Sequence, residues 1–141
     1  MPHPESAADN QNGLRGTETI LLIEDEVEIV ELLEKILTLF GYNVISSMDG
    51  NVGLEVYRSR SKTIDIVVSD LGLPGRDGLS LLQEALALDP QADFILTSGY
   101  LDIEQTEKLL SAGARAVIQK PYVPSALIRL IRTILDQRAR L

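Results

Sequence analysis

One lysine, one serine and several acidic residues stand where short apolar runs of the sequence end. Glu24 and Asp25 are the first of them, and Asp70, Ser98 and Lys120 follow further along the chain. Carboxylates that lie close together repel one another and favour a hard divalent cation such as Mg²⁺ or Mn²⁺. Beside that cation, a carboxylate oxygen of Asp70 can attack a phosphoryl group, while a hydroxyl and an ammonium stabilise the transition state. These residue types predict phosphoryl-transfer chemistry if the fold brings them together.

Each residue also has an ordinary explanation when it is taken alone. Asp70 could be a turn or cap residue, because turn-forming residues follow it directly. The acidic group at 24–26 could favour the positive end of a following helix. Ser98 could belong to a turn, and Lys120 could be a solvated surface charge. The common position of these residues in the fold must therefore decide between the two interpretations.

The spacing of apolar residues predicts five strands that alternate with five helices. The strands are short apolar runs, whereas the helices repeat apolar residues at intervals of three and four. The pattern also assigns Asp49 as a helix N-cap and Gly41 as a helix-ending residue. We expect strands at 19–23, 43–46, 64–70, 94–97 and 116–118, and helices at 27–40, 49–60, 79–88, 102–112 and from 124 onward.

Strands that alternate with helices run parallel with right-handed crossovers. This order predicts an α/β, doubly wound sheet with helices on both faces. Ligands of such sheets bind outside the carboxyl ends of the strands. Glu24 and Asp25 follow the first strand, and Asp70, Ser98 and Lys120 follow the third, fourth and fifth. Because four separate strand ends carry polar residues of matching type, the ordinary explanations weaken, and the sequence predicts one site on one rim.

The composition limits the class of protein. A length of 141 residues suits one globular domain, and the net charge of −8 argues against nucleic acid or an anionic membrane as a direct partner. The absence of cysteine excludes disulfides and thiolate chemistry. No apolar run is long enough to span a membrane, and the chain start lacks a signal pattern. We therefore expect a cytoplasmic domain.

Two other chemistries lack their parts. A serine hydrolase built on Ser98 would need a histidine base, and the only histidine is His3, near the start of the chain. A nucleotide-binding loop would need Gly-Lys-Ser or Gly-Lys-Thr after a glycine-rich run, and the sequence contains neither.

Four motifs in this order resemble the receiver domain of two-component response regulators, in the CheY-like superfamily. They are Ile-Leu-Leu-Ile-Glu-Asp-Glu at 20–26, Ser-Asp-Leu-Gly-Leu-Pro-Gly-Arg-Asp-Gly at 69–78, Ile-Leu-Thr-Ser-Gly-Tyr at 95–100 and Lys-Pro-Tyr at 120–122. The resemblance implies a flavodoxin-like (βα)5 fold with strand order 2-1-3-4-5, an order that is carried over from the family. It also implies a phosphorelay signalling domain that catalyses only its own phosphorylation and dephosphorylation.

The resemblance implies a role for each matching residue. Asp70 is similar to the phosphoacceptor, and Glu24 and Asp25 to the acid pair that holds Mg²⁺. Ser98 corresponds to the switch hydroxyl and Lys120 to the lysine that contacts the phosphoryl group. The backbone carbonyl at Gly72 is expected to complete the metal site. Phosphorylation in this family shifts the surface of the fourth helix, fifth strand and fifth helix.

Three positions bear on how the switch is tuned. Many receivers carry an aromatic residue three positions before the lysine, whereas this chain has Val117. The aromatic switch residue of those receivers is therefore absent here. Gly72 and Tyr100 lie two positions after Asp70 and Ser98, where the family tunes the rate of phosphate loss. We expect Tyr100 to shield the phosphoryl group from water.

Two alternative functions remain. An aspartate-nucleophile phosphatase usually places a second aspartate two residues after the nucleophile, and this chain has Gly72 there. A receiver-like module that binds a partner constitutively would not need Glu24, Asp25, Ser98 and Lys120 together, although Val117 is compatible with it.

The resemblance covers nearly everything after residue 17. We expect a flexible tail or linker at 1–16 and the receiver domain at 17–141. The segments 16–19 and 98–100 are similar to receivers fused to hybrid sensor histidine kinases, so we expect either such a module or a free-standing bacterial regulator. The implied partners are a histidine kinase or histidine phosphotransfer protein and an unknown downstream effector. The expected oligomeric state is a monomer or weak dimer.

Overall fold

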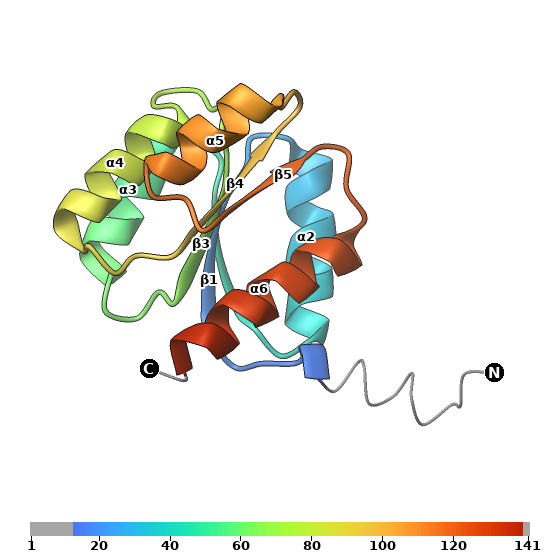
Figure 1. The fold of residues 1–141 in the computed structure, drawn as a ribbon. Helices are drawn as coiled ribbons and strands as arrows, with labels where there is room; N and C mark the ends of the chain where they lie inside the picture. Colours follow the sequence, from blue (N-terminus) through green and yellow to red (C-terminus); the bar gives the residue numbers. More distant parts are fainter. Residues whose placement is uncertain (1–12, 140–141) are drawn as a thin grey trace.

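The computed structural model describes residues 13–139 (Figure 1). Strands and helices alternate as the sequence predicts. The strands are β1 (Thr19–Ile23), β2 (Asn43–Ser47), β3 (Ile66–Asp70), β4 (Phe94–Ser98) and β5 (Ala116–Gln119), and the helices are α2 (Val27–Leu39), α3 (Gly50–Arg60), α4 (Gly78–Leu88), α5 (Ile103–Ser111) and α6 (Pro124–Ala139). Within residues 13–139, none of the helices is long and apolar enough to cross a membrane.

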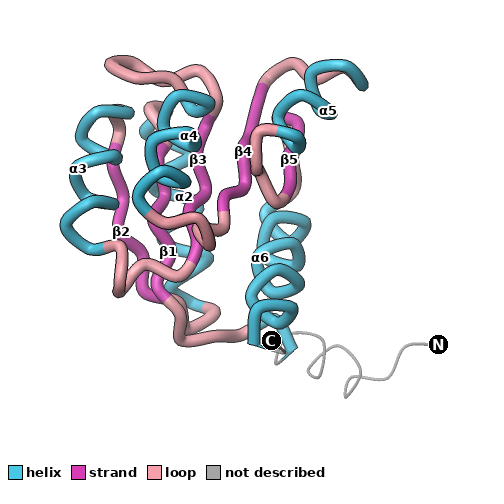
Figure 2. Tube along the Cα trace, turned by 60° about the vertical axis from the view of Figure 1, so that its left-hand side comes forward, coloured by secondary structure: helices cyan, strands magenta, loops and turns pink. Residues whose placement is uncertain are grey.

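The strands form one parallel sheet in the order β2-β1-β3-β4-β5. The predicted doubly wound fold and its strand order are confirmed. Helices α2 and α6 cover one face, and α3, α4 and α5 cover the other (Figure 1). Figure 2 shows the strands side by side, with the loops that follow β3 and β4 at the same edge. That edge is where the predicted site residues belong.

Alternate side chains of β1 enter two different cores. Ile20 and Leu22 pack among residues of α2 and α6, whereas Leu21 and Ile23 pack among residues of α3 and α4. Each fully buried aliphatic side chain of this kind contributes about 2 kcal/mol to folding. A strand covered on both faces needs an unbroken apolar run, and this requirement explains the sequence of β1.

Aspartate side chains fix the starts of three helices. Asp49 accepts hydrogen bonds from the backbone amides of Asn51 and Val52 at 2.7 and 3.1 Å, so its predicted role as the N-cap of α3 is confirmed. Asp77 and Asp102 cap α4 and α5 in the same way. Each cap typically contributes about 1 kcal/mol. Gly41, with φ +99°, follows the end of α2 as predicted.

The third strand begins at Ile66, two residues later than the sequence predicts. The backbone amides of Thr63 and Ile64 both donate to the Arg60 carbonyl, so this part of the chain closes the end of α3 instead of extending the sheet. Ile64 is nevertheless buried in the core beneath α3. Its burial in a loop explains why its apolar character alone suggested a strand.

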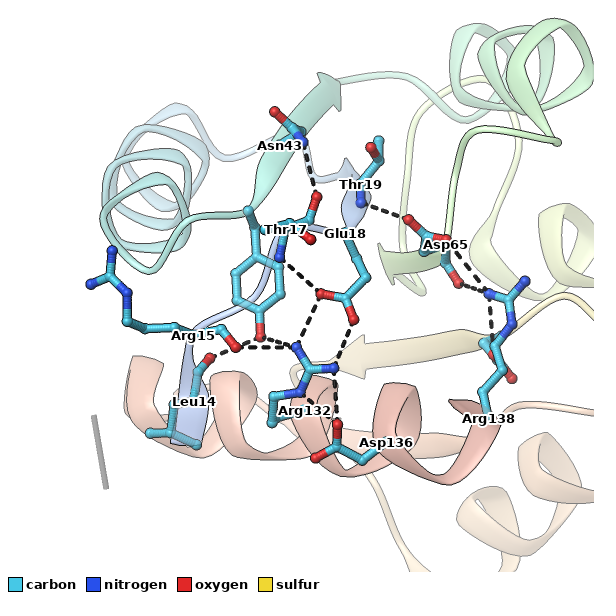
Figure 3. A network of polar contacts seen from close by, with 12 residues as sticks. Leu14, Arg15, Thr17, Glu18, Thr19, Asn43, Asp65, Arg132, Asp136 and Arg138 are labelled. Atoms are coloured by element: carbon cyan, nitrogen blue, oxygen red, sulfur yellow. Dashed lines mark hydrogen bonds and ion pairs between the residues drawn. The ribbon is translucent and has the colours of Figure 1, made fainter. Parts of the chain in front are cut away.

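A polar network joins residues 14–18 to Arg132 on α6 (Figure 3). The Arg132 guanidinium on α6 donates to both carboxylate oxygens of Glu18, at 2.7 and 3.0 Å, and the Tyr42 hydroxyl donates to the Leu14 carbonyl at 2.8 Å. The hydrogen bond from Arg132 holds the pKa of Glu18 below its usual value. Residues 14–16 thus contact the domain. The predicted division at residue 17 stays a prediction, because residues 1–12, including His3, lie outside the described part.

Candidate functional site

The parallel sheet places polar residues from four strands on one rim. Glu24 follows β1, Asp70 and Ser98 are the last residues of β3 and β4, and Lys120 follows β5. Asp70 stands opposite Thr97 in the register of β3 with β4, one residue before Ser98. The sheet therefore brings together residues that the sequence spreads over almost a hundred positions.

Three carboxylates form a compact cluster on this rim. Glu24, Asp25 and Asp70 each offer an oxygen, and these oxygens lie within 4.8 Å of one another. Glu24 and Asp70 are buried, whereas Asp25 is exposed. Burial raises the pKa of Glu24, and its contact with Lys120 opposes that rise. The all-oxygen donor set, open to solvent through Asp25, fits a hard cation such as Mg²⁺ that keeps part of its water.

Lys120 bridges the carboxylates. Its Nζ lies 2.6 Å from Glu24 Oε1 and 3.0 Å from Asp70 Oδ2, with Glu26 Oε1 further out at 3.5 Å. Burial lowers the pKa of Lys120, but the hydrogen bonds to Glu24 and Asp70 and their negative charges outweigh it and raise the pKa above its usual value. The ammonium is therefore a fixed positive charge directly beside Asp70.

The Ser98 side chain is turned into the loop that follows β4. Its hydroxyl donates to the Tyr100 carbonyl at 2.8 Å and accepts from the Tyr100 amide at 3.3 Å. Among the described residues, no hydrogen bond joins the Ser98 hydroxyl to Asp70 or Lys120, although the backbone amide of Lys120 donates to the Ser98 carbonyl at 2.7 Å. A rotation about its side chain, with loss of the Tyr100 contact, would be needed before this hydroxyl could face a group on Asp70.

The loop after β3 packs closely against Asp70 and then leads away from it. A Cβ at Gly78 would stand 2.5 Å from the Asp70 carbonyl oxygen, so this close approach of α4 requires glycine. At Gly72, in contrast, a Cβ would meet nothing within 4 Å. Gly72 is exposed, and a side chain at this position would point into open space.

Tyr100 lies in the loop after β4, and Val117 lies on β5. The Tyr100 residue is 68% exposed, and its backbone is the part that contacts Ser98. Val117 is half-buried and lines a shallow groove of about 760 Å³ between α5 and β5. The rate-tuning role of Tyr100 stays a prediction, and Val117 leaves open space where a larger side chain would stand.

Two rim residues have surroundings that the sequence did not predict. Glu26 contacts Lys120, although the acidic run 24–26 suggested only a helix-dipole role for it. Tyr122 packs beside the rim, and burial, with the charges of Glu24 and Asp70, raises its pKa to about 12. Tyr122 belongs to the Lys-Pro-Tyr motif that the sequence showed, but the sequence did not show that its side chain lies close to Glu24 and Asp70.

Comparison with known proteins agrees with this geometry. The family model described as the response regulator receiver domain matches residues 20–132. The chain belongs to the receiver domain family. Receiver domains are signalling modules of two-component systems, so the predicted class of function is confirmed.

Segments similar to this chain occur in both short and long proteins. The chemotaxis protein CheY of Treponema pallidum is 30% identical over 117 residues, which are 82% of this chain and 81% of that protein. The transcriptional regulatory protein DctD of Rhizobium meliloti is 31% identical over 85% of this chain, yet the match covers only 26% of DctD. This chain is thus comparable in extent to CheY but spans only a fraction of several longer relatives.

Solved structures show the same fold. A CheY-like receiver domain protein from Methanospirillum hungatei superposes with a TM-score of 0.80 at 30% identity, covering 89% of this chain and 98% of that one. The CheY of the CheX-CheY-BeF3-Mg²⁺ complex from Borrelia burgdorferi reaches a TM-score of 0.79 at 27% identity, covering 83% and 88%.

Proposed function

We propose that Asp70 of this receiver domain accepts a phosphoryl group. The observation that carries the proposal is the 3.0 Å contact between Asp70 Oδ2 and Lys120 Nζ inside the cluster of three carboxylates. A buried carboxylate beside a fixed ammonium and next to a cation site is placed both to attack phosphorus and to have the resulting charge neutralised.

Each neighbour then has one role. Glu24, Asp25 and Asp70, with the Gly72 carbonyl, would hold Mg²⁺, and the ion would neutralise charge on the phosphoryl oxygens. Lys120 would move its hydrogen bond from the Asp70 carboxylate to a phosphoryl oxygen. Ser98 would give up its bond to the Tyr100 carbonyl and donate to another phosphoryl oxygen. The Borrelia burgdorferi CheY structure, which contains BeF3 and Mg²⁺, supports a magnesium requirement here.

The output would follow from the movement of Ser98. Its hydroxyl holds the Tyr100 carbonyl just before α5, so its rotation would release the loop and reposition α5. We propose that the surface of α5, β5 and α6 then binds an effector. The phosphoryl donor would be a histidine kinase or phosphotransfer protein, and the 29% identity to the sensor kinase CckA of Brucella abortus over 95% of this chain supports a hybrid-kinase setting.

Incubation with acetyl phosphate and Mg²⁺ tests the proposal. We expect a base-labile mass increase of one phosphoryl group, which EDTA prevents and Asp70→Asn abolishes. Asp102→Asn is a matched control, since Asp102 follows the neighbouring strand but only caps α5. Modification that persists in Asp70→Asn, or its absence with every donor including a cognate kinase, would overturn the proposal.

A further inference from the structure

Glu26 is a carboxylate on the rim that the proposed reaction does not use. It occupies the N-cap position of α2, yet its side chain makes no capping hydrogen bond. Its Oε1 instead lies 3.5 Å from Lys120 Nζ, and its side chain is 57% exposed. The same ammonium contacts Glu24 and Asp70, so three carboxylates share one positive charge.

The position of Glu26 puts its charge on the approach to Asp70. Glu26 and Lys120 together line a hollow of about 390 Å³ that continues along α2 and past Pro121 and Tyr122. A donor that brings phosphorus to Asp70 must place phosphoryl oxygens against Lys120. Those oxygens then come close to the Glu26 carboxylate as well.

The charge balance makes Glu26 a source of repulsion. Glu24, Asp25 and Asp70 lose most of their repulsion when a divalent cation binds among them, because they supply its oxygen ligands. Glu26 is not a member of that cluster, and its side chain projects toward solvent. Its charge therefore persists at the mouth of the site and acts on whatever donor arrives.

We propose that Glu26 selects phosphoryl donors by their charge, and this inference rests on the proposed function of Asp70. Small anionic donors are disfavoured, and donors that carry a positive charge beside the phosphoryl group are favoured. In either case an Asp70 carboxylate oxygen forms the new O–P bond. The P–O bond of acetyl phosphate breaks to release acetate, whereas the P–N bond of phosphoramidate, protonated on nitrogen, breaks to release ammonia.

The two donors give a direct test, because acetyl phosphate is a dianion and protonated phosphoramidate carries one negative charge fewer. At a separation of about 7 Å in water, one charge difference changes the ratio of the two rates about threefold at low salt. Screening reduces this to about 1.5-fold at physiological ionic strength. Glu26→Gln should raise the ratio of acetyl phosphate rate to phosphoramidate rate by these factors, measured by rapid quench and intact-protein mass spectrometry.

Glu28→Gln is the matched control, because Glu28 lies in the first turn of the same helix and has the same effect on the helix dipole. It should leave the donor ratio unchanged. An unchanged ratio in Glu26→Gln, an equal change in Glu28→Gln, or an effect that salt does not reduce would each overturn the inference. Wild-type protein that reacts with neither donor would instead count against the proposed function of Asp70.

Discussion

Replacement of Lys120 by methionine should destabilise the domain in a way that depends on pH and on Mg²⁺. The substitution keeps an unbranched apolar stem but removes the charge that Glu24 and Asp70 share. The side chains of Lys120, Glu24 and Asp70 are only 13%, 3% and 10% exposed, so solvent replaces little of the lost interaction.

The expected loss of stability is the cost of removing one partner from a buried ion pair. Removal of one partner typically costs about 3–5 kcal/mol. Because the rim is open to solvent at Asp25, we expect a loss at the lower end of this range, about 3 kcal/mol. For a domain of this size, that loss lowers the melting temperature by about 10 °C.

The pH dependence has a defined sign. Burial already raises the pKa of Glu24 above its usual value, and removal of Lys120 also removes the interaction that opposes the rise. The folded variant then binds more protons than the unfolded chain, so its free energy of unfolding falls as the pH rises above about 4.5. The loss of stability should therefore be smaller at pH 5 than at pH 8.

Thermal unfolding followed by circular dichroism, in EDTA and in excess Mg²⁺, measures these effects. Mg²⁺ should stabilise Lys120→Met more than wild type, because the cation replaces the lost charge. Lys108→Met is the control, since Lys108 is exposed on α5 and makes no ion pair within the described residues. A loss of stability that is independent of both pH and Mg²⁺, or no loss at pH 8, would refute the electrostatic account of the rim.

Three further predictions concern other parts of the molecule. Arg132→Ala should lower the free energy of unfolding by about 2 kcal/mol at pH 7. This difference should shrink as the pH falls below about 4.5 and disappear below the lowered pKa of Glu18, where that carboxyl is protonated in both proteins. Gly78→Ala should cost more than about 2 kcal/mol, whereas Gly72→Ala should change stability by less than about 0.5 kcal/mol, both by urea denaturation. Tyr100→Ser should speed loss of the phosphoryl group after donor removal, measured by intact-protein mass spectrometry.

Each of these has a result that would contradict it. A pH-independent loss in Arg132→Ala would show that packing of its stem, rather than its charge, matters. Equal costs at Gly78 and Gly72 would mean that the approach of α4 to the Asp70 carbonyl is not tight. An unchanged or slower dephosphorylation of Tyr100→Ser would show that its exposed ring does not shield the site.

The sequence predicted the topology and the rim because both depend on local signals. Apolar runs bounded by turn residues define strands and helices, and the parallel arrangement then places every strand end on one edge. Asp70 and Lys120 were therefore assigned to one site although fifty residues separate them. Their neighbouring positions on the rim follow from the strand order, which the resemblance to the receiver family supplied, and the structure adds the contact at 3.0 Å.

Other features depend on side-chain geometry that no periodicity encodes. The Ser98 hydroxyl points toward Tyr100 because of the rotamer of its side chain. Glu26 contacts Lys120 because its side chain does not cap the start of α2. Ile64 was assigned to a strand because its burial is visible in the sequence while the path of its backbone is not. In each case the residue type was informative, but the sequence did not show where the side chain or the backbone points.

The contacts of residues 14–16 have a practical consequence for any shortened version of this protein. A protein that begins at residue 17, the predicted start of the domain, would lack the Leu14 carbonyl that accepts from Tyr42 and the Gly16 amide that donates to Phe40. Arg132 would keep Glu18 but lose the Arg15 carbonyl. A minimal domain for crystallisation, or a module fused to a different protein, should therefore be cut before Leu14.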